Sequence, residues 1–214
     1  MTIQEELWKG EFGDSYQARN LLTQEEIDLR IPFWENLLKT IYMNCGSVPN
    51  SFLEVGAGQG PNLGAINHIF DNTIKYNNQQ QIYATEINSS AREQLTTYIP
   101  NVIMVDDLSK VTNFADLVFT YGVLIHTHPA HVLPIMKDIY KASKRWIVCA
   151  EYFAPELRMI PYHGEQNALW LDDYGAKWVD NFPLRVIGYG FCWRKHTKLD
   201  NVTFWIFEKT EKMQ

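Results

Sequence analysis

The chain has 214 residues, 46% of them hydrophobic and 21% charged, and its formal net charge is −6 at pH 7. This length and composition predict one globular domain, and the acidic balance disfavours a nucleic-acid substrate, whose phosphates require a basic surface. No apolar run approaches the ~20 residues that span a bilayer, and the first residues show no signal-peptide core, so a cytoplasmic protein with a small-molecule partner is expected. The cysteines are widely separated and odd in number, which predicts reduced packing residues: Cys45, Cys149 and Cys192.

The N-terminal segment Trp8–Asn20 is polar and contains two glycines. Such a segment can fold over a ligand pocket as a lid, which would bring Tyr16 and Arg19 to the ligand. An equally open alternative is a solvated arm that docks only through Trp8 and Phe12.

A helix is predicted after this segment. Thr23 and Glu26 form a capping-box pattern, and apolar residues at helical spacing continue past Ile41. Pro32 is expected to kink this helix, which would cover a sheet.

The segment Phe52–Gly60 has the pattern of a buried strand that ends in an acid and then breaks into alternating glycines. Pro61 and apolar residues at helical spacing follow, so a strand, a glycine turn and a helix are predicted. Glycines permit positive φ and close approach to a ligand, and the helix N-terminus offers free N–H groups. The turn therefore predicts a binding site, the alternative being a glycine turn without a ligand.

The spacing of the glycines discriminates between ligands. Dinucleotide sites use Gly-x-Gly-x-x-Gly, whereas Gly56, Gly58 and Gly60 alternate and Pro61 holds the place of the third dinucleotide glycine. This spacing argues against NAD. Glu54, two residues before the first glycine, can accept hydrogen bonds from an ammonium group and its hydration network.

The next predicted strand, Gln81–Glu86, also closes on an acid. Glu86 is placed to accept both hydroxyls of a ribose, the alternative being a solvated acid. Asn88 marks the start of the helix that follows.

A third strand is predicted at Val102–Val105, followed by Asp106 and Asp107. Paired acids at a strand end suit a catalytic carboxylate pair, a metal site, a turn or an adenine contact. We expect the adenine contact, with Asp107 accepting from the amino group and Leu108 packing on the ring.

The fourth predicted strand, Ala115–Tyr121, runs into a turn that contains His126. Ligands in open α/β sheets sit beyond the carboxyl ends of the strands, so His126 is expected to line the reaction site and to act as a general base. The neighbouring His128 and His131 suggest a metal-binding site, which is disfavoured because no acid accompanies the histidines. A helix from about Leu133 or Pro134 to Ala142 and a fifth strand, Arg145–Tyr152, complete this region.

The rest of the chain is expected to bind an acceptor and to close the sheet. Residues 153–183 are irregular and form the predicted acceptor side, and two alternating strands, Leu184–Trp193 and Val202–Glu208, form a hairpin. The predicted fold is one α/β domain over 1–214 with a doubly wound, mostly parallel sheet. Its expected parts are an N-terminal lid with helices (1–45), a core (50–152), the acceptor side (153–183) and the hairpin (184–209).

With these residues in place, the chain resembles class I S-adenosylmethionine-dependent methyltransferases, and more narrowly the pseudaminic acid biosynthesis-associated methylase family. The glycine turn preceded by an acid looks like the first motif of the methyltransferases. The narrower resemblance covers nearly the whole chain and rests on these segments: Trp8–Asn20, Leu53–Ala57, Glu86–Asn88, Gly122–His126, Ala150–Tyr152 and Phe204–Lys209.

The resemblance implies a seven-stranded sheet with an antiparallel last strand. It also implies S-adenosylmethionine as methyl donor, S-adenosylhomocysteine as product, and a role beside nonulosonic or other surface-sugar biosynthesis. No metal is expected. The predicted cofactor contacts are Arg19, Glu54, Gly56, Ala57, Gly58, Glu86, Ile87, Asp107, Leu108 and Tyr121. The residues predicted to act in catalysis are His126 and Tyr16.

One departure from the family pattern bears on the acceptor. Where the family has more basic residues, this chain has Glu165, Asp172 and Asp173. The acceptor is therefore expected to differ from an acidic sugar or a nucleotide, with an amino sugar or another amine as the alternative.

Three rival functions stay open at this stage. A nucleotide-dependent oxidoreductase is disfavoured by the glycine spacing. A protein or RNA methyltransferase is disfavoured by the acidity and by Thr120-Tyr-Gly-Val, which stands where such enzymes carry an Asn-Pro-Pro-Tyr type tetrad. A non-catalytic methyltransferase-like partner subunit would keep the same donor-site residues.

Overall fold

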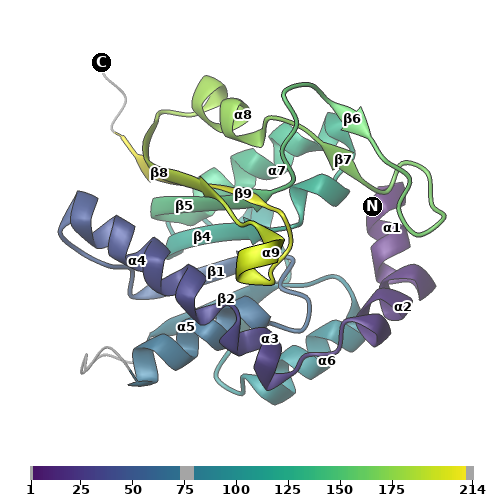
Figure 1. Cartoon of the computed structure of the whole chain (residues 1–214), viewed down its shortest axis with the longest axis horizontal. Helices are drawn as coiled ribbons and strands as arrows, with labels where there is room; N and C mark the ends of the chain where they lie inside the picture. The colour runs from purple at the N-terminus through teal and green to yellow at the C-terminus, as the bar shows by residue number, and fades with distance from the viewer. Residues whose placement is uncertain (1, 73–79, 211–214) are drawn as a thin grey trace. The chain divides into compact units, whose positions relative to one another are not determined.

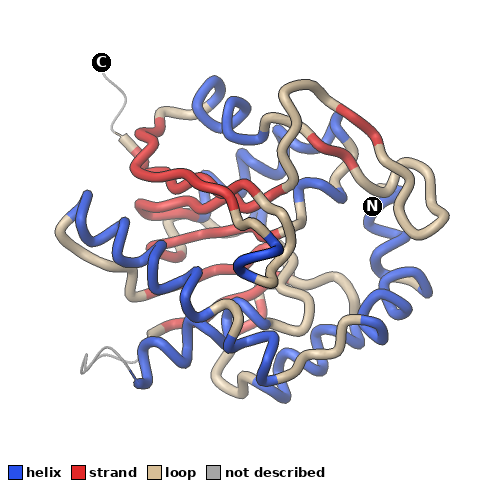
Figure 2. The backbone as a smooth tube through the Cα atoms, viewed as in Figure 1, coloured by secondary structure: helices blue, strands red, loops and turns tan. Residues whose placement is uncertain are grey.

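The computed structural model of the chain describes residues 2–72 and 80–210. The chain divides into two compact units, Met1–Asp107 and Leu108–Gln214, called here the first and second units. Each unit combines parallel strands with helices, and Figures 1 and 2 show the strands and helices of both.

The first unit contributes three parallel strands in the order β3-β2-β1. Their bounds are Ser51–Val55 for β1, Gln81–Thr85 for β2 and Ile103–Met104 for β3. The helices are α1 (Ile3–Lys9), α2 (Glu11–Arg19), α3 (Gln24–Asp28), α4 (Ile31–Cys45), α5 (Pro61–Asn72) and α6 (Ser89–Tyr98). Every residue of β1 is buried, as expected of a parallel strand covered on both faces.

The helix after the N-terminal segment differs from its prediction. The Thr23 hydroxyl accepts from the Glu26 N–H at 3.2 Å, as the capping pattern predicts, but the helix that it caps, α3, ends at Asp28. A second helix, α4, begins at Ile31 with Pro32 in its first turn. Because proline lacks an N–H and fits the first turn of a helix, it begins α4 and does not kink one long helix.

The segment Trp8–Asn20, for which the sequence left a lid or a solvated arm open, is helical apart from Gly10 and Asn20. The side chains of Thr2 and Glu5 form a capping box at the start of α1. Gly10 ends α1 and begins α2, which continues to Arg19. The N-terminal segment is therefore a pair of helices joined at a glycine.

The second unit contributes β4 (Ala115–Tyr121) and β5 (Ser143–Glu151), which are parallel, and an antiparallel hairpin of β8 (Leu184–Phe191) and β9 (Thr203–Lys209). The pairing of β9 with β5 is antiparallel. The remaining elements are η1 (Leu108–Lys110), η2 (Leu124–His126), α7 (Pro129–Ala142), β6 (Arg158–Met159), β7 (Trp170–Leu171), α8 (Tyr174–Asn181) and α9 (Arg194–Thr197).

The helix α7 begins at Pro129, four residues before the predicted start at Leu133. Its N-cap is His128, whose Nδ1 accepts from the Ala130 N–H at 3.3 Å. Pro129 lies in the first turn, where a residue needs no N–H for a helical hydrogen bond, so proline suits this start. A second proline, Pro134, lies inside the helix.

Seven strands form one mostly parallel sheet in the order β3-β2-β1-β4-β5-β9-β8. The predicted fold, a seven-stranded sheet with an antiparallel last strand, is confirmed. Residues 153–183 are more regular than predicted, because they contain the two-stranded β6-β7 pair and the helix α8. Within the described residues, no helix is both long and apolar enough to cross a membrane.

Candidate active site

The glycine turn after β1 has the backbone that its sequence predicts. Gly56, Gly58 and Gly60 have φ values of 69°, 57° and 86°. A Cβ at Gly60 would also lie 2.2 Å from the Leu95 Cδ1 atom of α6. The positive φ favours glycine at Gly60, and a Cβ there would also displace the end of the Leu95 side chain.

Glu54 at the end of β1 is a buried acid with one unsatisfied oxygen. Its exposed fraction is 2%, and Oε1 accepts from the Asn62 amide at 2.7 Å. Oε2 has no hydrogen-bond partner among the described residues. Burial raises the pKa of Glu54 from 4.5 to about 8, against the smaller opposing effects of the Asn62 hydrogen bond and the Arg30 charge. A cationic donor at Oε2 would satisfy this carboxylate.

Glu86, beyond the end of β2, joins the glycine turn to the next helix. Its Oε2 accepts from the Gly58 N–H and its Oε1 from the Asn88 N–H, both at 2.7 Å. Burial raises the pKa of Glu86, and these backbone hydrogen bonds oppose that effect. Each oxygen keeps a second lone pair, so the carboxylate can also accept from two hydroxyls. Ile87 beside it is 48% exposed and offers an apolar surface.

The N-terminal helices are attached directly to this region of the first unit. The Asn88 amide donates to the Asp14 carboxylate at 2.8 Å and to the Trp8 carbonyl at 3.3 Å. Its Oδ1 accepts from the Ala91 N–H at 2.9 Å and so caps α6. One side chain therefore links α6 with α1 and α2.

A second link joins α2 to the glycine turn itself. The Gln59 amide donates to the carbonyl and to the side-chain oxygen of Gln17, both at 3.0 Å, and its Oε1 accepts from the Leu22 N–H at 2.6 Å. Both glutamines are buried. The sequence analysis missed these roles of Gln17 and Gln59, since they lie 42 residues apart and neither has a motif.

The two lid residues differ in exposure. Tyr16 is half-buried and packs edge-on against Trp8, with ring centroids 5.2 Å apart. Arg19 is exposed in the last turn of α2. The helix that carries both residues is thus held near the glycine turn by Gln59, while the Arg19 side chain reaches solvent.

The predicted adenine contacts lie where the two units meet in the sequence. Asp107 is the last residue of the first unit and is half-buried, whereas its neighbour Asp106 is exposed and pairs with Arg92 at 2.5 Å. Leu108 opens η1 in the second unit and is half-buried, as is Tyr121 at the end of β4. The salt bridge with Arg92 gives Asp106, the more exposed of the two adjacent acids, a structural partner.

In the second unit, a buried acid holds the turn that carries His126. Glu151 at the end of β5 is fully buried, and its carboxylate accepts from the N–H groups of Val123, Leu124 and Ile125 at 3.1 to 3.3 Å. Burial raises the pKa of Glu151 to about 7, and its hydrogen bonds oppose that rise. The sequence placed an acid here but did not identify it as the anchor of η2.

His126 itself is held in one tautomer. Its Nδ1 lies 2.7 Å from the Ala168 carbonyl, and because a carbonyl only accepts, Nδ1 carries the proton of the neutral ring. Burial lowers the pKa of His126 from 6.5 to about 4. The imidazole is therefore neutral at pH 7 and a weak base, better suited to accept a hydrogen bond than to remove a proton.

Two acids of the acceptor side have structural partners. Asp172 is buried, accepts from the Asp173 N–H at 2.9 Å and pairs with Lys177 at 3.0 Å. Asp173 caps α8 by accepting from the Ala176 N–H at 2.8 Å. Asp172 and Asp173 therefore have structural roles, and the amine acceptor stays a prediction.

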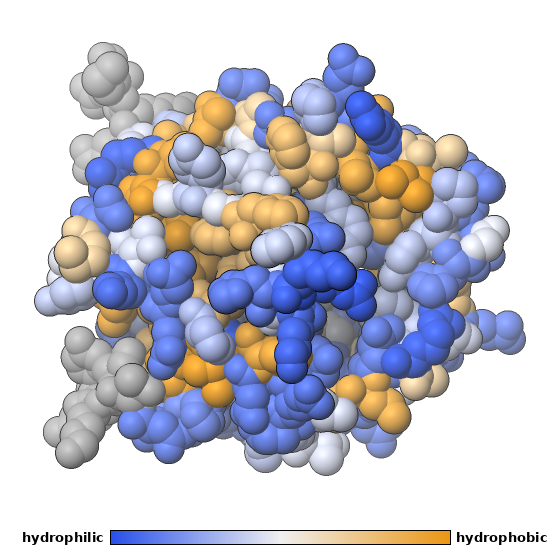
Figure 3. All heavy atoms as spheres, in the orientation of Figure 1, coloured by the Kyte–Doolittle hydropathy of each residue, from blue (hydrophilic) through white to orange (hydrophobic). Residues whose placement is uncertain are grey.

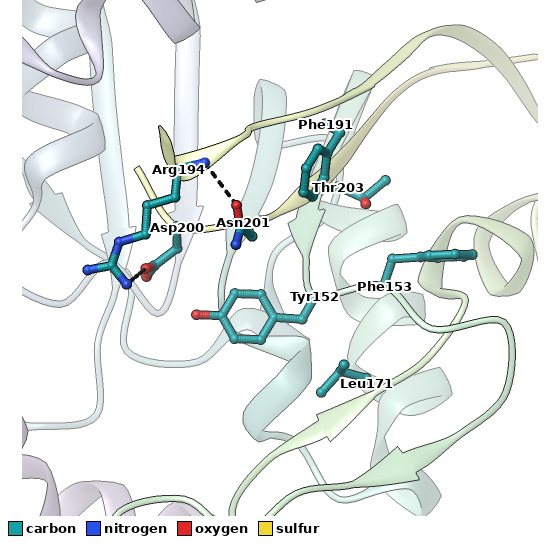
Figure 4. A pocket seen from close by; sticks show the side chains of 8 residues that line it. All are labelled: Tyr152, Phe153, Leu171, Phe191, Arg194, Asp200, Asn201 and Thr203. Carbon is teal, nitrogen blue, oxygen red and sulfur yellow. Dashed lines mark hydrogen bonds and ion pairs between the residues drawn. The ribbon is translucent and has the colours of Figure 1, made fainter. Parts of the chain in front are cut away.

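A cavity of about 520 Å³ opens in the second unit where β5, β7 and the β8–β9 hairpin come together (Figure 4). Its lining residues are Tyr152, Phe153, Leu171, Phe191, Arg194, Asp200, Asn201 and Thr203. Within residues 2–72 and 80–210, no three His, Cys, Asp or Glu side chains cluster in a way that could hold a metal ion.

No protein-family model matches the sequence, and no curated protein matches it. Solved structures do match the fold. The 1,6-didemethyltoxoflavin-N1-methyltransferase of Burkholderia thailandensis, with 1,6-didemethyltoxoflavin and S-adenosylhomocysteine bound, is 13% identical with a TM-score of 0.68, over 99% of this chain and 92% of that chain. The magnesium protoporphyrin IX methyltransferase of Synechocystis, with S-adenosylmethionine bound, is 11% identical with a TM-score of 0.67. The match covers 98% of this chain and 99% of that chain.

A third structure, the plantazolicin methyltransferase with S-adenosylhomocysteine, is 10% identical with a TM-score of 0.62, over 97% of this chain and 94% of that chain. The chain therefore has the Rossmann-like fold of S-adenosylmethionine-dependent methyltransferases. None of these three structures is a pseudaminic acid biosynthesis-associated methylase, so the narrower resemblance stays a prediction.

The link between α2 and α6 can be tested by a charge exchange. Asn88→Asp keeps the oxygen that caps α6 but replaces the donor facing Asp14 with a second carboxylate. We expect the amide hydrogens of α2 to exchange about tenfold faster in this variant, measured by mass spectrometry, because local opening becomes easier. Adding Asp14→Asn to Asn88→Asp restores a donor and should restore slow exchange. Equal exchange in all three proteins would contradict the link.

The state of His126 can be read by nuclear magnetic resonance. We expect the Nδ1–H tautomer of a neutral ring from about pH 7 down to about pH 5, with resonances assigned by comparison with His126→Gln. The folded pKa lies below the unfolded one, so the free energy of unfolding should fall as pH falls from 6.5 to about 4. Protonation of the folded ring near pH 6.5, or an Nε2–H tautomer, would show that burial does not control this group.

Proposed function

We propose that the chain is an S-adenosylmethionine-dependent methyltransferase that acts on a small molecule. The observation that carries this proposal is the buried Glu54 carboxyl, whose Oε2 has no partner among the described residues, beside a glycine turn with positive φ. A buried polar atom without a partner is costly, so its presence at a strand end indicates a ligand donor. The matched structures that carry S-adenosylmethionine or S-adenosylhomocysteine support the same cofactor.

The residues of the first unit fit this cofactor. Glu54 Oε2 would accept from the ammonium group, and Glu86 would accept from the two ribose hydroxyls while its backbone donors hold it in place. Asp107 would accept from the adenine amino group, and Ile87 would pack on the ring. Gly56, Ala57 and Gly58 would let the backbone approach the ligand.

Four further cofactor contacts are proposed. Leu108 would pack on the adenine, and Tyr121 at the end of β4 would contact the cofactor. Arg19 would bind the carboxylate of the cofactor, and Tyr16 would stabilise its cationic sulfur through the ring face.

Bound S-adenosylmethionine would supply an electrophilic methyl group, which is displaced in line by the acceptor atom. The protein contributes chiefly by holding acceptor, methyl carbon and sulfur in line. His126 would lie beside the acceptor and orient the lone pair of its attacking atom. Because His126 is a weak base, this arrangement suits an acceptor that attacks before it loses its proton, such as a neutral amine.

The finer proposal for the acceptor is a sugar or nucleotide sugar, in particular an amino sugar, of surface-polysaccharide biosynthesis. Its support is the sequence resemblance at Trp8–Asn20 and Gly122–His126. The acidic net charge of −6 also suits an uncharged or amine-bearing acceptor better than a phosphate-rich one.

Calorimetry can test the role of Glu54. At pH 6.5 its carboxyl, with a pKa of about 8, is protonated in the free protein, whereas a bound ammonium favours the ionised form. Binding of S-adenosylhomocysteine at pH 6.5 should therefore release about one proton, measured as the dependence of the binding heat on the ionisation enthalpy of the buffer. The matched variant Glu54→Gln should bind without that release.

The same variant has a second, ligand-free readout. The folded pKa of Glu54 is raised, so its contribution to the free energy of unfolding is present below pH 4.5 and lost as pH rises to about 8. Glu54→Gln should be less sensitive to pH over this range. If both proteins released the same number of protons on binding, Glu54 would not face the ammonium.

A further inference from the structure

The cavity at the tip of the β8–β9 hairpin lies at the carboxyl edge of the strands in the second unit. Thr203 is paired with Glu151 of β5 on one side and with Phe191 of β8 on the other, so the ends of all three strands meet there. The short helix α9 joins β8 to β9 at the same edge. Ligands of open α/β sheets bind beyond this edge, and Glu151 also anchors the turn of His126.

Large apolar side chains line this cavity. Phe153 and Phe191 are 45% and 58% exposed, and Tyr152 and Leu171 complete the apolar lining. Figure 3 shows hydrophobic side chains, in orange, on the surface over β8 and β9. Apolar rings grouped around a cavity of ligand size indicate a binding site for a ring with at least one apolar face.

The polar residues of the cavity form a hydrogen-bonding edge. Asn201 Oδ1 accepts from the Arg194 N–H at 2.8 Å, which leaves the Asn201 amide free to donate. The Thr203 hydroxyl can donate or accept. Figure 4 shows Asn201 and Thr203 on the hairpin side of the cavity, with the Tyr152 ring reaching toward Asp200.

The charges of the lining cancel. Arg194 and Asp200, the one basic and the one acidic residue of the lining, lie 3.9 Å apart, and both side chains are largely exposed. Neither an anionic nor a cationic ligand would find an unpaired counter-charge there. An uncharged ligand is the one that this lining binds without breaking an ion pair.

We propose that this cavity binds the methyl acceptor through an uncharged ring, which stacks on the aromatic side chains of Tyr152 and Phe191 and bonds along one edge to Asn201 and Thr203. The proposal rests on the methyltransferase function proposed above and assigns acceptor-binding residues within the second unit. A carboxylate or phosphate group of the acceptor, such as the diphosphate of a nucleotide sugar, would lie outside this cavity. An aromatic heterocycle and a neutral pyranose both have the required chemistry.

Saturation-transfer nuclear magnetic resonance with four probes separates these cases. Indole and methyl α-glucopyranoside are the uncharged rings, and indole-3-acetate and glucuronate are their anionic counterparts. The test variant is Phe191→Ala, and the control is Tyr189→Ala, whose side chain is 77% exposed on the same strand but does not line the cavity. Each probe is measured with the three proteins, with and without S-adenosylhomocysteine.

At least one uncharged probe should bind about tenfold more weakly to Phe191→Ala than to the wild type, and equally to Tyr189→Ala and the wild type. The indole and glucoside signals then tell which ring class the cavity prefers. Equal binding to Phe191→Ala and wild type, no binding of either uncharged probe, or stronger binding of the anionic probes would overturn the proposal. Displacement of the probe by S-adenosylhomocysteine would overturn it too, because the cavity would then belong to the cofactor.

The stability of each protein with S-adenosylhomocysteine separates this proposal from the proposed function. If Phe191→Ala loses the uncharged probe while S-adenosylhomocysteine stabilises all three proteins, both stand. If the probe is lost from that variant and S-adenosylhomocysteine stabilises none of them, the ring site stands but its assignment to a methyl acceptor fails.

Discussion

The Glu86 carboxylate is the interaction on which the candidate cofactor site depends. By accepting from the Gly58 N–H and the Asn88 N–H, it fixes the glycine turn after β1 against the start of α6. The backbone N–H groups of a turn and of a helix start need hydrogen-bond acceptors. A carboxylate can accept from these N–H groups and from the hydroxyls of a ribose at the same time. The N-terminal helices are attached one bond further on, through Asn88 and Gln59. A change in this carboxylate would therefore reach both the turn and the helices that carry Tyr16 and Arg19.

In the second unit, too, a buried carboxylate fixes a turn by accepting from backbone N–H groups. Glu151 ends β5, is fully buried, and accepts from three successive N–H groups of the turn that carries His126. The Tyr174 hydroxyl donates to the Leu124 carbonyl at 3.2 Å and so adds a second anchor from α8. A ring held this firmly, with one tautomer and a low pKa, orients a substrate better than it accepts protons.

The sequence predicted the parts of the fold and site that depend on local chemistry. Alternating glycines after a strand, proline at a helix start and Asn88 as an N-cap each act within a few residues, and all three are present. The roles of Gln59 and Glu151 could not be predicted, because they depend on partners 26 to 42 residues away. The structural roles of Asp172 and Asp173 could not be predicted either, because the sequence alone does not distinguish acids that face a ligand from acids that cap a helix or form an ion pair.

The central claim, that the first unit binds an adenosyl methyl donor, is tested most directly by thermal unfolding with S-adenosylmethionine, S-adenosylhomocysteine and NADH. A ligand at about 100 times its dissociation constant adds about 2.7 kcal/mol of stability, which raises the unfolding temperature of a chain this long by about 5 to 10 °C. The account predicts that rise with both adenosyl compounds and none with NADH. A rise with NADH alone, or with none of the three, would contradict it.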